Sequence, residues 1–149
     1  MDSYVRNFVR ASLLWLGVGV SLGIAMAVWP VPMLQYRPAH MHANLLGFVA
    51  MMIFGVAYHI MPRFNGRPLH SPALAELHLV VANAGLLLMV AGFAARVHWP
   101  GRGAWILAAG GLLSAVGTLL FITNIWITIR PAATAAMPSP VMTSPERTP

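Results

Sequence analysis

Four long apolar runs constrain this chain more than any other feature. The hydrocarbon core of a bilayer is about 30 Å thick and needs roughly 20 apolar residues per helix. Four runs without Arg, Asp or Glu meet this length, at about residues 11–29, 39–62, 77–95 and 103–129. Only 8% of the residues are charged, against about a quarter in soluble domains. The sequence therefore predicts an all-α integral membrane protein that spans a lipid bilayer four times.

The connections between these runs are short and contain helix-breaking residues. Pro30 and Pro32 follow the first run, and two segments rich in Gly, Pro and Arg, residues 63–68 and 100–103, follow the second and third. Helices joined by short connections must alternate in direction, so residues 1–130 are predicted to form a four-helix up-down bundle. Residues 131–149 consist mainly of Pro, Ala, Ser and Thr, which predicts a disordered cytoplasmic tail.

The arginines predict the orientation in the membrane. In an up-down bundle, both termini and the second connection lie on one side and carry six arginines, against three on the other side. Because cytoplasmic loops are enriched in Lys and Arg, both termini are predicted to be cytoplasmic, in the inner membrane of a bacterium. The arginines occur singly at the ends of apolar runs, as headgroup anchors do, so the net charge of +6 does not indicate nucleic-acid binding.

His40 and His42 stand at the start of the second run, on the predicted outer side. Two residues on an α-helix correspond to about 200° of rotation, so the two imidazoles leave the helix on nearly opposite sides and do not converge on one ion. Each could instead be an axial ligand of a haem b iron whose other ligand comes from a neighbouring copy. The alternative is a pair of interfacial histidines bonded to water and headgroups.

The absence of cysteine excludes covalent haem attachment and iron–sulfur clusters.

Three further residues are candidates for the same site. Arg37 could pair with a haem propionate or anchor the helix at the headgroups. Asn44 could orient a histidine or satisfy backbone groups at the helix start. His98, on the same side of the membrane, could contact a propionate or provide a third ligand, although its neighbours Trp99 and Pro100 also suit an interfacial belt.

His59, Glu76 and His78 form a second candidate group on the opposite side. His59 lies about 25 Å along the helix axis from His42, so one iron cannot use both. Because the second and third helices run antiparallel, His59 could approach Glu76 and His78 and hold a metal ion or a quinone headgroup. The alternative is a structural network that caps the second connection.

The segments 37–48 and 54–62 together resemble the second helix of subunit I of the haem–copper oxidase superfamily, especially its nitric oxide reductase and cbb3-type branches. That helix opens with an Arg-x-x-His-x-Asn pattern whose histidine is an axial ligand of low-spin haem b. Here Arg37-x-x-His40 fits one half of the pattern and His42-x-Asn44 fits the other. Either histidine could therefore be the counterpart. The His-x-His pair also resembles another helix of that subunit, in which the two imidazoles serve two different haems.

The resemblance implies an architecture and a function. Subunit I has three four-helix arcs around a pseudo-threefold axis, and a four-helix chain is similar to one arc. Together with the opposed histidines, this implies a homotrimer with haem b between neighbouring protomers, His40 from one and His42 from the next. Such a b-type cytochrome would serve electron transfer, with a redox partner protein or quinone, or redox or gas sensing.

Two alternatives to a cytochrome are a small haem oxidase or nitric-oxide-handling enzyme with an exchangeable ligand, and a non-haem metal-binding or quinone-binding accessory subunit of a respiratory oxidase. The sequence departs from subunit I in three respects. It has no adjacent His-His pair for a copper site, no third arc and no acidic proton channel within its spans. Reduction of O2 or NO by this chain alone is therefore not expected.

Overall fold

A computed structural model describes residues 2–130, and the predicted tail lies outside the described residues. The described part is helical and contains no strand, which confirms the predicted all-α class. Three of the spans are single α-helices, namely α1 (Ser3–Val28), α5 (Pro72–His98) and α6 (Pro100–Ile129). The remaining span is a composite helix of five pieces: α2 (Pro30–Met33), the 3-10 turn η1 (Leu34–Tyr36), α3 (Arg37–His42), the π-helix η2 (Ala43–Ala50) and α4 (Met51–Phe64).

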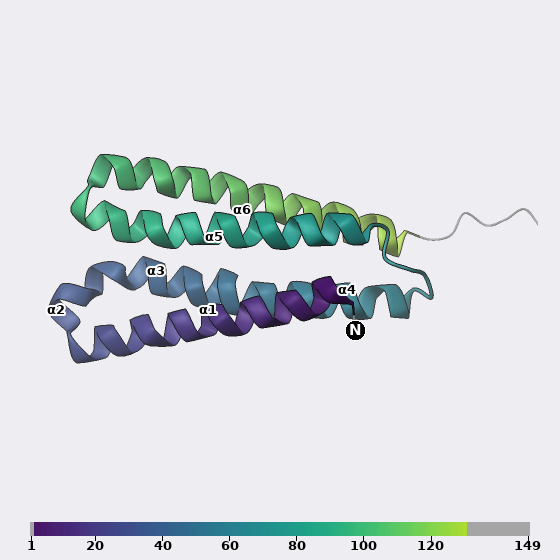
Figure 1. Cartoon of the computed structure of the whole chain (residues 1–149), viewed down its shortest axis with the longest axis horizontal. Helices are drawn as coiled ribbons and strands as arrows, with labels where there is room; N and C mark the ends of the chain where they lie inside the picture. The colour runs from purple at the N-terminus through teal and green to yellow at the C-terminus, as the bar shows by residue number, and fades with distance from the viewer. Residues whose placement is uncertain (1, 131–149) are drawn as a thin grey trace, which may run out of the picture.

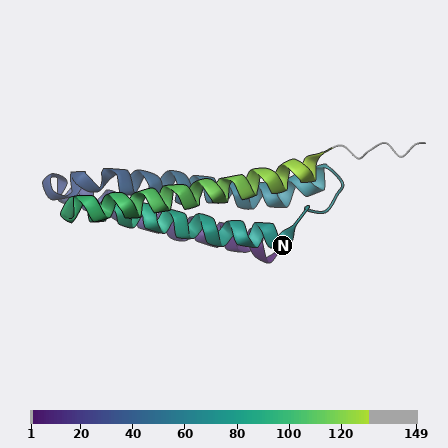
Figure 2. The same ribbon diagram turned by 90° about the horizontal axis from the view of Figure 1, so that it is seen from above.

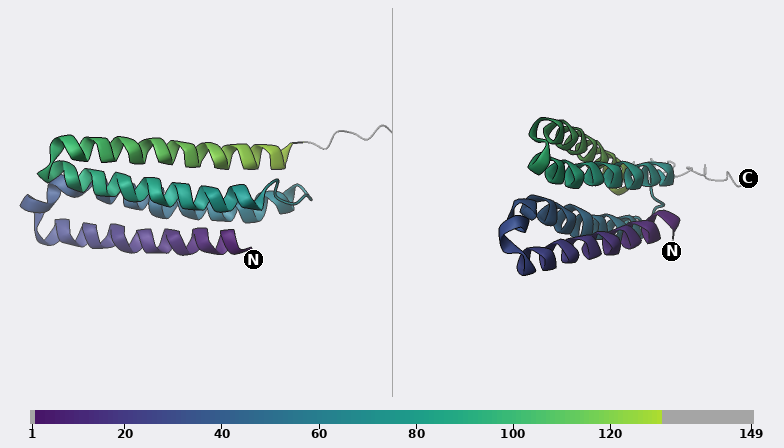
Figure 3. Two further views of the ribbon diagram at one scale, coloured as in Figure 1. Left: turned by 45° about the horizontal axis from the view of Figure 1, so that its top comes forward. Right: turned by 60° about the vertical axis from the view of Figure 1, so that its left-hand side comes forward.

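The four spans form two antiparallel hairpins that lie side by side (Figures 1 and 3). The composite helix pairs with α1, and α5 pairs with α6, while α1 contacts α5 and α4 contacts α6 between the hairpins. Asp2, the connection 65–71 and Arg130 lie at one end of the bundle, called here the N-terminal end (Figures 1 and 2). Residues 30–36 and Trp99 form the opposite end, called here the far end. The up-down topology is thus confirmed.

The distribution of polar and apolar side chains is the reverse of that in a soluble protein. All four spans are long and apolar enough to cross a bilayer, and large apolar side chains such as Leu14 and Trp105 are 73% and 81% exposed. Polar side chains such as Ser12 and Asn124 are fully buried between the helices. Lipid can cover such an apolar exterior, whereas water cannot do so favourably. The chain is an integral membrane protein.

The observed helices extend beyond the predicted spans. The prediction considered only runs without Arg, Asp or Glu, whereas α1 already begins at Ser3 and carries Arg6 and Arg10 as exposed residues on its first turns. Long arginine side chains can reach the headgroup region from a helix end, so they do not terminate the helix. At the start of the composite helix, Pro30 and Pro32 lie in the short helical turn α2 instead of in an irregular loop. Proline is compatible with a helical first turn, because the N–H that it lacks would be unpaired there.

The α5–α6 hairpin is held by direct contact between the two backbones. At Gly110, an added Cβ atom would lie 2.5 Å from the Met89 backbone nitrogen and 2.8 Å from the Gly85 carbonyl oxygen. Such distances leave no room for any side chain, and the obstructing atoms belong to the backbone. Small residues at the interface therefore set how closely these two helices approach, as is usual in membrane bundles.

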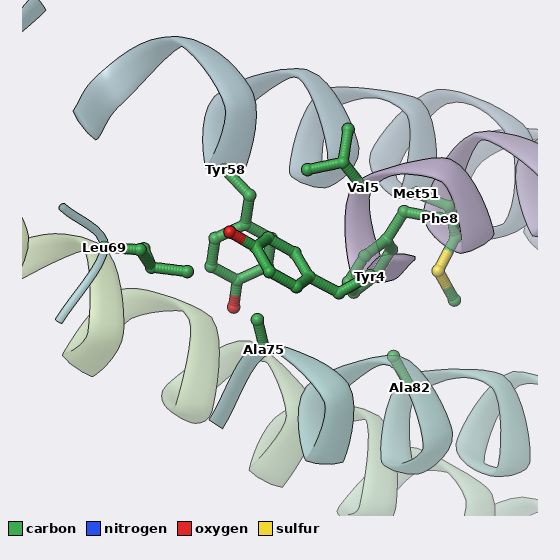
Figure 4. Packing of buried hydrophobic residues seen from close by; sticks show 8 residues of the cluster. All are labelled: Tyr4, Val5, Phe8, Met51, Tyr58, Leu69, Ala75 and Ala82. Atoms are coloured by element: carbon green, nitrogen blue, oxygen red, sulfur yellow. The ribbon is translucent and has the colours of Figure 1, made fainter. Parts of the chain in front are cut away.

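A cluster of buried side chains fills the N-terminal end of the bundle (Figure 4). The rings of Tyr4 and Phe8 in α1 pack against that of Tyr58 in α4, with ring centroids 5.9 Å and 5.6 Å apart. The other buried apolar members of this cluster are Val5, Met51, Leu69, Ala75 and Ala82. The cluster joins the two hairpins at this end.

Asn124 in α6 attaches the connection between the hairpins to the bundle. Its Oδ1 atom accepts a hydrogen bond from the Ser71 backbone N–H at 3.0 Å, and its Nδ2 atom donates to the Ser71 carbonyl at 2.8 Å. Ser71 in turn caps α5, because its hydroxyl accepts from the Leu74 N–H. The side chain of a single buried asparagine thus fixes the start of α5 against α6.

We expect Asn124→Leu to destabilise the bundle by about 1–3 kcal/mol. The partly buried Ser71 N–H loses its partner, and the Ser71 carbonyl keeps only its bond from the Ala75 N–H. The free energy of unfolding can be measured by titrating the detergent-solubilised protein with SDS and following helicity by circular dichroism. Thr123→Leu, at the exposed neighbouring position, is the matched control and should have little effect. Equal effects of the two substitutions would contradict this role of Asn124.

Candidate functional site

His40 is anchored to the neighbouring helix α1. It lies in α3, half-buried, and its Nδ1 atom is 2.8 Å from the carbonyl oxygen of Gly19. A carbonyl oxygen only accepts hydrogen bonds, so Nδ1 carries the proton and donates. In neutral imidazole the second nitrogen, Nε2, then has a lone pair available for a metal.

His42 shows the same arrangement with different partners. Its Nδ1 atom is 2.8 Å from the carbonyl oxygen of Pro38, one turn earlier in the composite helix. Its ring lies against Phe93 of α5, with centroids 4.8 Å apart. Within residues 2–130, no hydrogen bond involves the Nε2 atom of either His40 or His42. In its neutral form, each histidine therefore leaves Nε2 available to a metal.

The two imidazoles face different neighbouring helices, His40 toward α1 and His42 toward α5. This is the arrangement that their two-residue spacing predicts. A single small ion cannot be bound by both rings of one chain in this conformation. If both Nε2 atoms bind metal, each needs a separate metal centre.

A wide helical segment begins directly after the histidine pair. The π-helix η2 has eight residues, although π-helical hydrogen bonding is usually limited to one turn and is frequent at functional sites. Asn44, in its first turn, donates from Nδ2 to the His40 carbonyl oxygen at 2.9 Å. An added Cβ atom at Gly19 would overlap the Asn44 amide, and one at Gly23 would lie 3.1 Å from Cε1 of His40. The two glycines thus let α1 approach the His40 face closely.

Arg37 and His98 lie at the same end of the bundle as the histidine pair. Arg37 is exposed at the start of α3 and makes no side-chain hydrogen bond within the described chain. His98 is also exposed, and its Nε2 atom is 3.1 Å from the Tyr36 hydroxyl. Its ring centroid is 5.8 Å from that of Trp99. Both residues lie at the far end of the bundle, and their contacts with a propionate remain predictions.

The structure does not bring His59, Glu76 and His78 together. Glu76 is exposed and accepts from the Ser3 hydroxyl, His59 bonds to Arg63 one turn later, and His78 is buried in the core. Between Asp2 and Arg130, no group of three His, Cys, Asp or Glu side chains could hold a metal ion. These three residues therefore do not form the predicted metal site within one protomer.

Tyr58 is a polar residue of the core to which the sequence analysis assigned no role. It lies in α4, is 1% exposed, and its hydroxyl is 3.1 Å from Nδ1 of His78. A hydroxyl within an apolar run is costly in a bilayer unless it has a partner, and this signal was present in the sequence. The partner could not be identified from the sequence, because it is 20 residues away on another helix.

Comparison with known proteins finds one matching family and several related oxidase subunits. Residues 3–145 match the family model described as "Cytochrome C and Quinol oxidase polypeptide I". The chain is 28% identical over 160 residues to the cbb3-type cytochrome c oxidase subunit CcoN1 of Stutzerimonas stutzeri, covering 88% of this chain and 34% of that protein. It is 28% identical over 173 residues to a cytochrome c oxidase subunit 1 homolog of Azorhizobium caulinodans, covering 97% of this chain and 31% of that protein.

The chain thus spans about a third of the length of the curated relatives that it matches. The family model covers most of the sequence, including all four spans and the histidine pair. The chain belongs to the family of cytochrome c and quinol oxidase polypeptide I.

Proposed function

We propose that the protein is a membrane-embedded b-type cytochrome with haem axial ligands His40 and His42. The observation that supports this most strongly is the anchoring of both Nδ1 atoms to backbone carbonyls at 2.8 Å. Metal-binding histidines usually donate their other N–H to a carbonyl or carboxylate, which fixes the tautomer and the ring orientation. Two histidines prepared in this way, with no cysteine in the chain, suit non-covalent bis-histidine haem.

The surface around His42 suits a flat apolar group. Met41, Leu45 and Val49 are 45%, 57% and 42% exposed on the composite helix beside the histidine pair. A porphyrin, together with a neighbouring copy of the chain, would cover such a surface and remove it from lipid. Arg37 and His98 at the membrane surface would then serve the charged propionates.

We infer that the site is shared between copies of the chain. Because the rings of His40 and His42 face different helices, each iron needs its second imidazole from another protomer. A cyclic oligomer, in which every protomer makes the same contact with the next one, satisfies this requirement. Three copies would provide as many helices as the three arcs of subunit I, to one of which a four-helix chain is similar.

In this arrangement His40 of one protomer and His42 of the next would hold the haem. Haem with two protein ligands supplies one-electron transfer. The proposed role is therefore electron transfer, with a redox partner protein or quinone approaching the far end, or redox or gas sensing. The arginine distribution supports an orientation in which the far end is on the outer side and both termini are cytoplasmic.

An absorption spectrum of the purified full chain tests the proposal. After expression with sufficient haem, we expect a Soret band that shifts on reduction and does not change when carbon monoxide is added, because six-coordinate iron has no open position. Native mass spectrometry should show a trimer. The absence of a Soret band, with the protein still folded, would overturn the proposal.

A second candidate function follows from the relatives, which are named as oxidase subunits. A small haem oxidase or nitric-oxide-handling enzyme would need one exchangeable axial ligand. Carbon monoxide would then bind the reduced protein and shift the Soret band. The same spectrum therefore separates the two candidates.

A further inference from the structure

A cavity at the N-terminal end of the bundle has two arginines in its lining. Its volume is about 500 Å³, within the range of about 300–1,000 Å³ that is typical of ligand pockets. Arg63, Arg67 and Asp2 line it, and all three are exposed. The Asp2 carboxylate accepts a hydrogen bond from the Tyr4 hydroxyl at 3.2 Å. Two guanidinium groups and one carboxylate leave the described lining with a net positive charge.

The backbone at the end of α4 fixes the positions of the two arginines. Gly66 has a φ of 60°, the left-handed conformation that commonly ends a helix. Its N–H donates to the Arg63 carbonyl at 3.2 Å, and the Arg67 N–H donates to the Pro62 carbonyl at 3.1 Å. These two bonds form a Schellman motif. Both arginine side chains therefore extend from a hydrogen-bonded turn and not from a loose loop.

Each guanidinium group is anchored through one nitrogen and keeps further donors. Nη1 of Arg63 donates to Nδ1 and to the carbonyl oxygen of His59. Nη1 of Arg67 donates to the Arg130 carbonyl oxygen at 2.9 Å. A guanidinium group has five N–H donors in one plane, and within residues 2–130 these are the hydrogen bonds of the two side chains. The remaining N–H groups are available to an anion.

The rest of the cavity wall is mainly apolar. Tyr58 and Leu69 are 1% and 8% exposed and form its inner side (Figure 4). Pro62, Pro68 and Pro72 also line it. Because the four helices cross the bilayer, an end of the bundle lies near the headgroups, where lipid phosphates meet the first carbons of the acyl chains. The cavity thus combines positive charge and apolar surface at the level where a phospholipid combines negative charge and apolar surface.

We propose that this cavity binds the phosphate group of an anionic phospholipid through Arg63 and Arg67. The planar guanidinium group matches phosphate oxygens in charge and in geometry, and basic pockets between membrane helices bind anionic headgroups. The prolines and Leu69 cover the apolar part of the lipid next to the phosphate. The lining comes from the start of α1, from α4 and from the connection to α5, so a bound lipid contacts both hairpins.

This inference concerns neither His40 nor His42 and does not depend on the haem proposal. Native mass spectrometry of the full chain in detergent micelles tests it. The probe is phosphatidylglycerol, and the comparison lipid is phosphatidylcholine, in which the choline cancels the phosphate charge. We expect one phosphatidylglycerol per chain to remain bound under conditions that remove phosphatidylcholine. Equal retention of the two lipids would overturn the proposal.

Inorganic phosphate distinguishes a lipid site from a site for free phosphate. It carries the same anionic group but has no apolar part to cover the prolines and Leu69. At a concentration equal to that of the lipid, it should not displace phosphatidylglycerol. Displacement by inorganic phosphate would overturn the lipid as the ligand.

Two double variants with the same loss of charge separate this site from general attraction to the headgroups. Arg63→Gln with Arg67→Gln should weaken phosphatidylglycerol binding about tenfold or more, because hydrogen bonds to a charged group are lost. Arg6→Gln with Arg10→Gln removes two exposed arginines of α1 outside the cavity lining and should leave binding near that of the wild type. Equal losses in the two double variants would overturn the site. The single variant Arg67→Gln replaces the first double variant if circular dichroism shows that the latter does not fold.

Discussion

His40→Ala and His42→Ala are each expected to abolish haem retention. If every iron is held by one His40 and one His42, each substitution removes one axial ligand from every site in the assembly. The measurement is Soret absorbance per mole of protein after purification, with size-exclusion chromatography to confirm that the protein remains folded. His59→Ala is the matched control, because His59 lies in the same composite helix and bonds to Arg63 near the N-terminal end. It should keep its haem.

Co-expression of the two inactive variants provides a sharper test of the shared site. In a cyclic trimer, an intact site forms wherever a His42→Ala protomer provides His40 and the next protomer, His40→Ala, provides His42. Random mixing of the two chains creates such a pair at about a quarter of the interfaces, so about a quarter of the wild-type Soret absorbance should return. No recovery would contradict sharing between protomers, and a haem-loaded monomer in native mass spectrometry would exclude it.

The four spans were predictable because bilayer thickness fixes the required length of an apolar helix. The divergence of His40 and His42 was predictable because helical rotation depends only on sequence separation. The hydrogen bonds of their Nδ1 atoms were not predictable. One acceptor, the Gly19 carbonyl, belongs to another helix, and its position depends on how closely α1 approaches.

The π-helix η2 had no recognisable sequence signal. Residues 43–50 are mostly apolar, and this composition predicts an ordinary α-helical part of a membrane span. Tertiary contacts accompany this segment, including that between Gly47 and Trp15, where an added Cβ atom would lie 2.5 Å from the tryptophan side chain. Such contacts depend on the packing of α1 and cannot be read from local sequence.

The prediction that His59, Glu76 and His78 come together as metal ligands is wrong, and the sequence spacing of Glu76 and His78 explains why. Antiparallel helices bring residues to the same depth but do not determine which way the side chains point. Glu76 and His78 are two residues apart, so about 200° of rotation separates them. His78 consequently faces the core, where it bonds to Tyr58, and Glu76 is exposed.

Gly110→Ala is expected to cause a large loss of stability, because it adds a methyl group at the contact between the α5 and α6 backbones. The new Cβ atom would lie 2.5 Å from the Met89 nitrogen and 2.8 Å from the Gly85 carbonyl oxygen. Backbone atoms cannot rotate away as a flexible side chain can, so the two helices must separate along the contact. Overpacking of this kind costs about 1–3 kcal/mol and occasionally more, and we expect a value at or above the upper end. SDS titration of the full chain, followed by circular dichroism, measures this change in the free energy of unfolding.

Gly111→Ala is the matched control, because it makes the same chemical change one residue later. An added Cβ atom at Gly111 meets no atom within 4 Å, and alanine in a helix interior is more favourable than glycine by about 0.5–1 kcal/mol. We therefore expect this variant to be as stable as the wild-type protein or slightly more stable. Equal destabilisation by both substitutions would contradict the α5–α6 packing. A loss at Gly111 that appears only at protein concentrations where protomers associate would instead place Gly111 at the contact between protomers.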